Sequence, residues 1–416
     1  MRSSRKLAAG LADASLAALG TFLAGIVAVR ELDTRALAVY AVLFSATVLG
    51  MLLPRQLHYV PAQLGANLEP DLRSPLVGRD ARRARLVSAG TFLIAVGSGL
   101  SLVGSAPVAV CLGMGLMAGL YAVVSPLQDH IRAALHLVDR HASAAVCSVV
   151  LAATVGAGTV FGLTHHGAPG LELLPFGALF AGNVLSIGVG VLLLRGAPRH
   201  QGYVQQAVPV RARLLFSEVA VQGGWFACNY AILLVLGGAV LAHLEAARVV
   251  ASPITILTAA LVTFMGPAVL RRLRSTPENP HGPRRDVLLV SGMVALGGAL
   301  YIGVLALFGP VVSAILNKPL DLALASARIG EYVVEGVSTI VTLVVFAMGR
   351  TRLALGNSVV AGGAGFLGTL VLAAPLGPFA LPVAQTLGMA ARLVSSSAGM
   401  ERGTRASALE PEPAVA

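Results

Sequence analysis

Long apolar stretches, separated by short polar, charged or proline-containing segments, run along almost the whole chain. Each stretch has about 20 mostly apolar residues, the length that an α-helix needs to cross the hydrocarbon core of a bilayer. The pattern predicts twelve spanning helices, at Leu7–Val29, Ala36–Leu53, Leu86–Ser105, Val108–Val124, Ala142–Leu163, Leu173–Leu194, Ser217–Gly238, Ala246–Leu270, Val287–Phe308, Ala327–Met348, Leu353–Ala374 and Phe379–Val394. We therefore expect an all-α polytopic membrane protein that begins with an uncleaved first span.

The composition excludes a soluble fold of this size. Of the 416 residues, 56% are hydrophobic and 12% are charged, and the mean hydropathy is +0.81, whereas soluble domains carry about 25% charged residues. The net charge of +11 could suggest nucleic-acid binding, but only 5% of residues are aromatic and the basic residues lie between the apolar stretches. We interpret these residues as topology signals that face anionic lipid headgroups, and expect no nucleic-acid partner.

Basic residues are concentrated in alternate connectors. The connectors after the second, sixth and eighth stretches are rich in arginine, whereas residues 104–107, 164–172 and 374–378 contain neither lysine nor arginine. The positive-inside rule then predicts a multi-pass plasma-membrane protein with both termini in the cytoplasm, which requires an even number of spans. The long connector Pro54–Arg85 is expected to lie partly on the cytoplasmic surface, and Gln128–Arg140 is interpreted as an amphipathic interfacial connector.

The two halves of the chain carry matching landmarks. Arg35 and Pro54 flank the second stretch, and Arg248 and Pro267 recur in the eighth, in both cases 213 residues later. This spacing suggests an internal duplication into parallel six-span repeats. The predicted organisation is an N-terminal lobe at 1–194, a cytoplasmic linker at 195–213, a C-terminal lobe at 214–399 and a disordered cytoplasmic tail at 400–416.

Charges inside the spans mark candidate functional positions, because they are costly in the bilayer. Arg328, Glu331 and Glu335 share one helix face at i, i+3 and i+7. They suit either a water-filled cavity, where a carboxylate takes up a proton or cation, or a helix end with its charges among headgroups.

The remaining charged positions in the spans are interpreted one by one. Asp13 is alone among apolar residues, and is either a functional proton site or a satisfied carboxylate inside the bundle. Glu218 either joins a polar set or snorkels to the cytoplasm, Arg248 beside Glu245 is expected to snorkel at the outer interface, and Arg392 is also expected at an interface. No cysteine or histidine cluster suits a metal, and no ATP-binding motif is present, so no cofactor is expected.

Three stretches of the chain resemble segments of known membrane proteins. The run from Leu11 to Arg30, with Ala38-Val-Tyr40-Ala after it, looks like the opening of the polysaccharide flippases of the MATE-like multidrug/oligosaccharidyl-lipid/polysaccharide exporter superfamily. Pro126-Leu-Gln-Asp-His-Ile-Arg132 is similar to their stretch after span four. Glu245-Ala-Ala-Arg248, followed by Pro253, is similar to the segment that opens their span eight.

The resemblance implies two six-helix lobes around a central cavity, and alternating access. The implied cargo is a polyprenyl-pyrophosphate-linked oligosaccharide, turned from the inner to the outer leaflet for cell-surface polysaccharide assembly, with assembly enzymes as possible partners. Arginines in such a cavity could form charge-assisted bonds with pyrophosphate, and the candidates are Arg30, Arg248 and Arg328. The candidates for proton or cation coupling are Asp13, Glu331, Glu335 and Glu218.

Two other classes of protein stay open. One is a small-molecule or drug exporter of the MATE or major facilitator type; the loop motif of the latter is only loosely matched by Gly78-Arg-Asp-Ala-Arg-Arg83. The other is a polytopic glycosyltransferase or polymerase with Glu31-Leu-Asp33 as an acidic pair in an outer loop. The short outer connectors disfavour this class, and we expect a transporter rather than an enzyme.

Overall fold

The computed structural model describes residues 2–60, 77–195, 208–261, 282–348 and 350–407. Within these ranges the chain is almost entirely helical. The helices are α1 (Arg2–Glu31), α2 (Thr34–Pro54), the π-helix η1 (Arg55–Tyr59), α4 (Val77–Ser101), α5 (Val108–Leu137), α6 (His141–Thr164), η3 (Leu171–Leu173), α7 (Leu174–Leu193), α8 (Val208–Val235), α9 (Gly238–Ala251), α11 (Gly282–Leu316), α12 (Leu322–Ala347), α13 (Thr351–Leu376), η4 (Gly377–Phe379) and α14 (Ala380–Ser407).

The predicted all-α membrane fold is confirmed. Ten helical stretches of the described residues are long and apolar enough to cross a membrane, or eleven if the bent pair Gly238–Ala251 and Pro253–Leu261 is one span. One of these stretches, Thr351–Gly399, includes α13 and the part of α14 up to Gly399. Each of the twelve predicted stretches overlaps a helix, because an apolar segment of this length satisfies its backbone in a bilayer only as a helix.

Several predicted boundaries are wrong. The eighth span begins at Gly238 rather than Ala246, and its helix bends by 44° where Pro253 cannot continue the hydrogen-bond ladder. The last part of the prediction, 262–270, lies outside the described residues. Residues 208–213 of the predicted linker belong to α8, and the rest of the linker lies almost entirely outside the described residues.

The predicted disordered tail is also too long, because α14 continues to Ser407. After Pro382 the next proline is Pro411, so nothing in residues 400–407 breaks a helix that is already formed. Of the predicted tail, 408–416 lie outside the described residues.

The segment Gln128–Arg140 is not an interfacial connector. Residues up to Leu137 continue α5, and Gln128, Ile131 and Leu135 are buried. They pack against Cys147 of α6 and residues at the end of α7. The segment stays helical because one face is covered by neighbouring helices, although its mean polarity resembles that of a surface segment.

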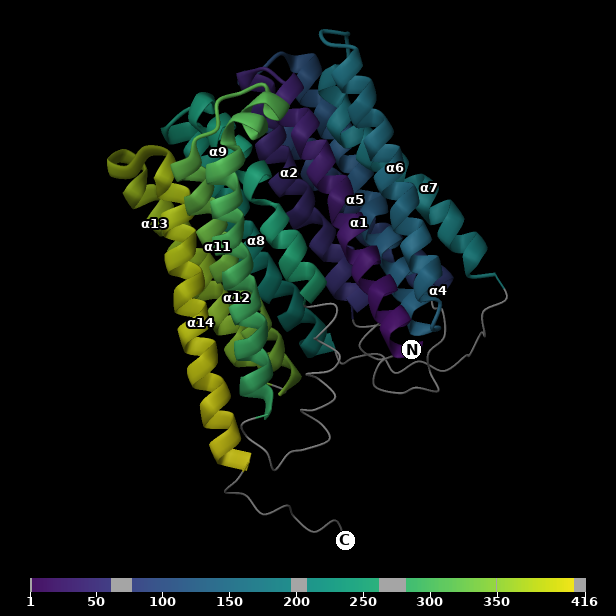
Figure 1. The fold of residues 1–416 in the computed structure, drawn as a ribbon, viewed down its shortest axis with the longest axis vertical. Coiled ribbons are helices and arrows are strands. Elements are labelled where there is room, and N and C mark those ends of the chain that lie inside the picture. Colours follow the sequence, from purple (N-terminus) through teal and green to yellow (C-terminus); the bar gives the residue numbers. More distant parts are fainter. Residues whose placement is uncertain (1, 61–76, 196–207, 262–281, 349, 408–416) are drawn as a thin grey trace.

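The helices of each half of the chain pack mainly on one another. Helices α1, α2, α4, α5, α6 and α7, here called the first-half helices, form one group, and α8, α9, α11, α12, α13 and α14, the second-half helices, form the other. Contacts between the groups run from α2 to α8 and α9, and from α1 to α9 and α11. Figure 1 shows the two groups side by side.

The start of α1 and the end of α14 lie at the same end of the bundle (Figure 1). We call this end the terminal side and the other end the distal side. The positive-inside rule predicts that the terminal side is cytoplasmic. Because α1 runs from the terminal side, its last residue Glu31 lies at the distal side.

The core joins both groups of helices. Tyr40 of α2 is fully buried, with its ring 5.0 Å from that of Phe176 of α7, and the same apolar cluster includes Leu244 of α9 and Ile329 of α12. Elsewhere α8 and α13 approach so closely that a Cβ on Gly362 would overlap the carbonyl oxygen of Ala220. Small residues of this kind let backbones of spanning helices touch.

Candidate functional site

Arg248 and Glu245 form an ion pair within α9, in which Glu245 is buried and Arg248 is partly buried. Nε and Nη2 of Arg248 donate to the two carboxylate oxygens of Glu245 at 2.7 and 2.6 Å, across one helical turn. The guanidinium also lies over the ring of Phe44 of α2, 4.2 Å from its centroid. Interfacial snorkelling is therefore wrong for this pair: the helix begins about two turns earlier, at Gly238, and carries both side chains between the two groups of helices.

Arg328 and Glu331 form a second pair of the same type on α12. Nη1 of Arg328 donates to Oε2 of Glu331 at 2.5 Å, and Nη2 lies 3.4 Å from the hydroxyl of Tyr332. Both charged side chains are buried, at 3% and 0% exposure. This burial contradicts the headgroup interpretation of these two charges, and the other interpretation, a water-filled cavity, stays a prediction.

An aromatic pair covers Arg328. The rings of Trp225 on α8 and Tyr332 on α12 stack at 5.7 Å between centroids, with 16° between their planes. The guanidinium carbon lies 5.5 Å from the Trp225 ring and 5.3 Å from the Tyr332 ring. A cation held close to aromatic ring faces is attracted electrostatically by the rings, in addition to its hydrogen bonds.

Several buried polar atoms in this region have no hydrogen-bond partner within the described residues. They belong to α8, α12 and α14, and those that we group as the interior polar set are Trp225 Nε1, Arg328 Nε, Glu331 Oε1, Ser338 Oγ, Gln385 Oε1 and Arg392 Nε. Each unsatisfied buried group costs roughly 1–3 kcal/mol. The set contains both hydrogen-bond donors and acceptors, so it suits a ligand that can both accept and donate hydrogen bonds.

Glu335, Glu218 and Arg392 extend the charges of this region onto three helices. Arg392 of α14 is 3% exposed, so the expected interfacial position is wrong. Its charge interacts with those of Glu335 on α12 and Glu218 on α8. Both carboxylates are half-buried, and within the described part of the chain neither forms an ion pair or hydrogen bond. Glu335 also interacts electrostatically with Arg328, which links the two parts of the stripe.

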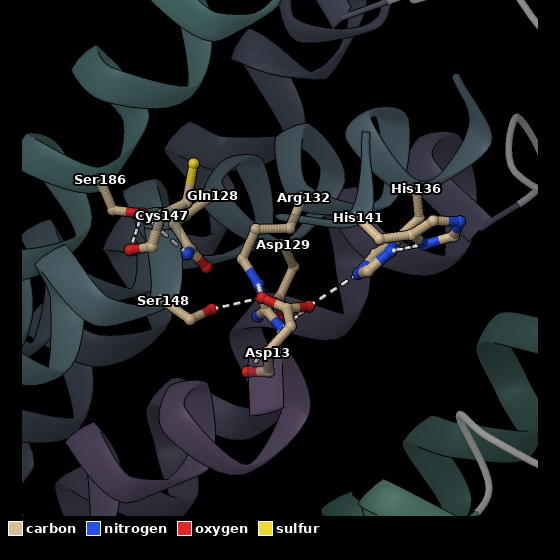
Figure 2. Close-up of polar contacts among 9 residues, drawn as sticks. All are labelled: Asp13, Gln128, Asp129, Arg132, His136, His141, Cys147, Ser148 and Ser186. Carbon is tan, nitrogen blue, oxygen red and sulfur yellow. Dashed lines mark hydrogen bonds and ion pairs between the residues drawn. The ribbon is translucent and has the colours of Figure 1, made fainter. Parts of the chain in front are cut away.

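Asp13 belongs to a separate polar network among the first-half helices. Figure 2 shows its carboxylate between Arg132 and His136 of α5 and Ser148 of α6. Arg132 donates through Nε to Oδ1 at 2.9 Å and through Nη2 to Oδ2 at 2.8 Å, while Ser148 Oγ donates to Oδ1 at 2.6 Å. His136 Nε2 lies 2.8 Å from Oδ2. Asp13 thus has the satisfied environment that was one of its two interpretations.

The network continues to the end of α5. His136 Nδ1 lies 2.8 Å from Nδ1 of His141 at the start of α6, and Arg132 Nη1 donates to Asp129 at 3.0 Å. Nearby, Gln128 donates to Ser186 of α7, whose hydroxyl donates to the carbonyl of Cys147. The polar side chains of the segment predicted as a connector therefore join α1, α5, α6 and α7.

The structure separates Arg30 from the other two candidate arginines. Arg248 and Arg328 lie within electrostatic reach of each other. Arg30 instead donates to the carbonyl oxygens of Ala314 and Ile315 at the end of α11, at 3.2 and 2.7 Å.

The acidic residues at the turn between α1 and α2 also have structural partners. Glu31 lies 2.9 Å from His166 and 3.3 Å from Arg30, and Asp33 caps α2 by accepting from the backbone of Ala36 at 2.7 Å. Both carboxylates of the acidic pair that a glycosyltransferase would need, Glu31 and Asp33, therefore already have structural partners.

Some members of these networks could not be found from the sequence. Trp225, Tyr332 and Gln385 lie on three different helices and give no spacing signal. Arg132 and His136, by contrast, stand at i and i+4, which places them on one helix face. That spacing is a usable signal only if the segment is taken as a helix, and its polarity favours a connector instead.

The sequence matches no protein-family model and no curated protein. The structure resembles an outward-facing multidrug resistance MATE family transporter of the MOP superfamily, with a TM-score of 0.66 and 13% identity over 98% of this chain and 95% of the other. An inward-facing member of that family gives a TM-score of 0.64 and 12% identity, over 94% and 95%.

A third match is a MOP superfamily transporter from Pyrococcus furiosus Vc1 (DSM3638), whose binding pocket is described as having reverse polarity. Its TM-score is 0.62, with 13% identity over 97% of this chain and 95% of the other. At such identities the likeness concerns the fold, and the finer resemblance to polysaccharide flippases stays a prediction. The protein has the polytopic, all-helical fold of the MATE transporters.

Proposed function

We propose that this protein is an alternating-access transporter that turns a lipid-linked oligosaccharide from one leaflet of the membrane to the other. The fold supports the transport part of this proposal. The observation that carries the choice of cargo is the interior polar set beside the Trp225–Tyr332 stack. The enzymes that make and use such lipids are the expected partners.

The interior polar set suits a sugar because a hydroxyl both donates and accepts hydrogen bonds. Trp225 Nε1 and Arg328 Nε offer buried donors, and Glu331 Oε1 and Gln385 Oε1 offer buried acceptors. Aromatic faces with a few placed polar groups are typical of ligand sites. When the interior opens, a polyhydroxylated cargo could fill hydrogen bonds that the closed protein leaves unmade.

The two arginine pairs suit the pyrophosphate part of the cargo. Arg248 and Arg328 each have one carboxylate partner on the same helix. A pyrophosphate offers the same bidentate acceptor geometry as a carboxylate, so it can exchange for Glu245 or Glu331. The displaced carboxylate of Glu245 or Glu331 then binds a proton or a cation in place of its arginine, which would couple cargo binding to an ion.

The coupling groups that we favour are Glu331, Glu335 and Glu218. Glu335 and Glu218 have no hydrogen-bond partner within the described residues, and Glu331 has one free oxygen. Asp13 is the weaker candidate, since Arg132, His136 and Ser148 occupy both of its oxygens.

A second candidate function is the export of organic cations. The carboxylates of Glu218, Glu245, Glu331 and Glu335 outnumber the arginines of this region, Arg248, Arg328 and Arg392. Carboxylates beside stacked aromatic rings attract planar cations. This charge balance is the observation that supports the drug-exporter class as the second candidate.

The test reconstitutes the purified full-length protein into liposomes. One arm follows leaflet exchange of a fluorescent polyprenyl-pyrophosphate glycan, and the other follows uptake of a fluorescent organic cation. We expect protein-dependent glycan exchange that Arg328→Ala abolishes and that the exposed Arg352→Ala leaves unchanged. Cation uptake without glycan exchange would overturn the flippase proposal and support the second function. Activity in neither arm would overturn both.

A further inference from the structure

Arg30 and Lys318 make reciprocal contacts between the two groups of helices at the distal side. Arg30 of α1 donates through Nη1 to the carbonyl oxygens of Ala314 and Ile315 at 3.2 and 2.7 Å. Lys318, which follows α11, donates through Nζ to the carbonyl oxygen of Leu32, which follows α1, at 3.2 Å. Each cation therefore binds the carboxyl end of a helix in the other half of the chain.

The carboxyl end of α11 is shaped for such a contact. Asn317 takes a left-handed conformation, with φ 52°, and Lys318 N donates back to the carbonyl of Ser313 at 3.2 Å. This is a Schellman ending, in which Lys318 N and Asn317 N satisfy the carbonyls of Ser313 and Ala314. Arg30 adds a side-chain donor to the carbonyls of Ala314 and Ile315, and its positive charge complements the negative end of the helix dipole.

The surroundings hold both cations in place. Glu31 pairs with Arg30 at 3.3 Å and with His166 at 2.9 Å. The turn after α11 is fixed by Ser313, whose hydroxyl accepts from Leu320 N at 3.0 Å. Burial lowers the pKa of Lys318, although the negative charge of Asp33 acts in the other direction and raises it. A lysine that loses part of its hydration needs its acceptor, so the Leu32 carbonyl is a required partner.

We infer that Arg30 and Lys318 form a latch that holds the distal side closed. Each of the two cations caps the carboxyl end of a helix in the opposite half of the chain. Opening this side requires the ends of α1 and α11 to separate, which breaks these hydrogen bonds together. The significance of the latch for transport rests on the proposed alternating access, but its geometry does not depend on the cargo. We therefore assign Arg30 to the latch instead of to the pyrophosphate-binding role that the sequence suggested.

The test measures the opening directly, without cargo. Spin labels on His165→Cys and Ala374→Cys, two exposed positions at the distal ends of α6 and α13, report the distance across this side by double electron–electron resonance. Cys111, Cys147 and Cys228 are buried and should not react with the label.

We expect one short-distance population in the otherwise unchanged protein. Loss of a hydrogen bond to a charged group should raise the ratio of open to closed protein by about tenfold. Arg30→Gln and Lys318→Gln should therefore each add a long-distance population, and the double variant should add more. Arg30→Lys should retain most of the short population, and the exposed Arg35→Gln is the matched control without a latch contact.

Identical distance distributions in the double variant and in Arg35→Gln would overturn the latch. If the double variant does not fold, the comparison of Arg30→Gln with Arg30→Lys decides in the same way. Because no cargo is present, a failed flippase assay leaves this result intact, and a failed latch leaves the cargo proposal standing.

Discussion

Arg132 of α5 binds both carboxylate oxygens of Asp13 of α1, at 2.9 and 2.8 Å, across 119 residues of sequence. Ser148 and His136 complete the coordination of this carboxylate. The contact joins the first helix of the chain to α5 and α6 close to the terminal side. A carboxylate with so many donors stabilises the packing of these helices, and that is the role we assign to it.

Asp13→Asn should destabilise the protein. The substitution leaves the partly buried guanidinium of Arg132 with only the exposed Asp129 as a counter-charge, and breaking a buried pair costs up to about 3–5 kcal/mol. The control Ser148→Ala removes one hydrogen bond to the same carboxylate and should cost about 1.5–3 kcal/mol. Thermal unfolding in detergent measures both. Unchanged stability in Asp13→Asn, combined with loss of gradient-driven transport, would instead return Asp13 to the coupling role.

Glu335→Gln should uncouple transport from the ion gradient. The substitution keeps the size of the side chain and removes its ability to exchange a proton or bind a cation at neutral pH. We expect cargo exchange to continue but no longer to respond to an imposed pH or sodium gradient. Glu172→Gln, in the distal connector η3, is the control. A gradient response as large as in the unchanged protein would exclude Glu335 as the coupling group.

Gly362→Ala should weaken the packing of α13 on α8. The added methyl group would overlap the Ala220 carbonyl oxygen, so the helices must separate, at a cost of about 1–3 kcal/mol. A methyl group on the neighbouring Gly363 would meet no atom within 4 Å, and Gly363→Ala should be neutral or slightly stabilising. The melting temperatures of the two variants give the comparison. Equal melting temperatures would show that this contact is not tight.

Asp321→Ala should reduce stability in a pH-dependent way. Asp321 caps α12 by accepting from Leu324 N at 2.9 Å, and this hydrogen bond, with His243 nearby, lowers the pKa of the carboxyl. A lowered pKa in the folded state means that the carboxylate stabilises the protein above the ordinary carboxyl range. This contribution is lost as the pH falls through the folded-state value.

The difference in stability between Asp321→Ala and the unchanged protein should therefore be about 1 kcal/mol at neutral pH and shrink in acid. Asp321→Asn keeps a capping side chain and should lose little stability at neutral pH. Unfolding curves across the acid range measure the effect. A difference that stays constant down to the lowest pH would contradict the assignment.

The fold was largely predictable because the bilayer imposes one length and one type of structure on every apolar stretch. The prediction failed at α5, where hydropathy ends the span at Val124 while burial against α6 and α7 carries the helix to Leu137. It also misplaced Arg392, since an isolated arginine near a span end gives no sign of the carboxylates on α8 and α12.

The candidate site was predictable only in its local parts. The pairs Glu245–Arg248 and Arg328–Glu331 follow from their i, i+3 spacing. Contacts between distant segments do not, as the ion pair of Asp13 with Arg132 shows. The position of Arg30 at the end of its span was evident, but its acceptor on α11 was not.

The main-chain acceptors of Arg30 and Lys318 affect what a comparison of homologous sequences can detect. The partners of Arg30 and Lys318 are main-chain oxygens, which every residue type supplies. Correlated substitutions between homologues reveal contacts between side chains, and here only one member of each contact can be substituted. Coevolution methods should therefore find no signal between α1 and α11 from this contact. A comparison of relatives should instead ask whether a cation persists at each of these two positions, independently of what lies opposite.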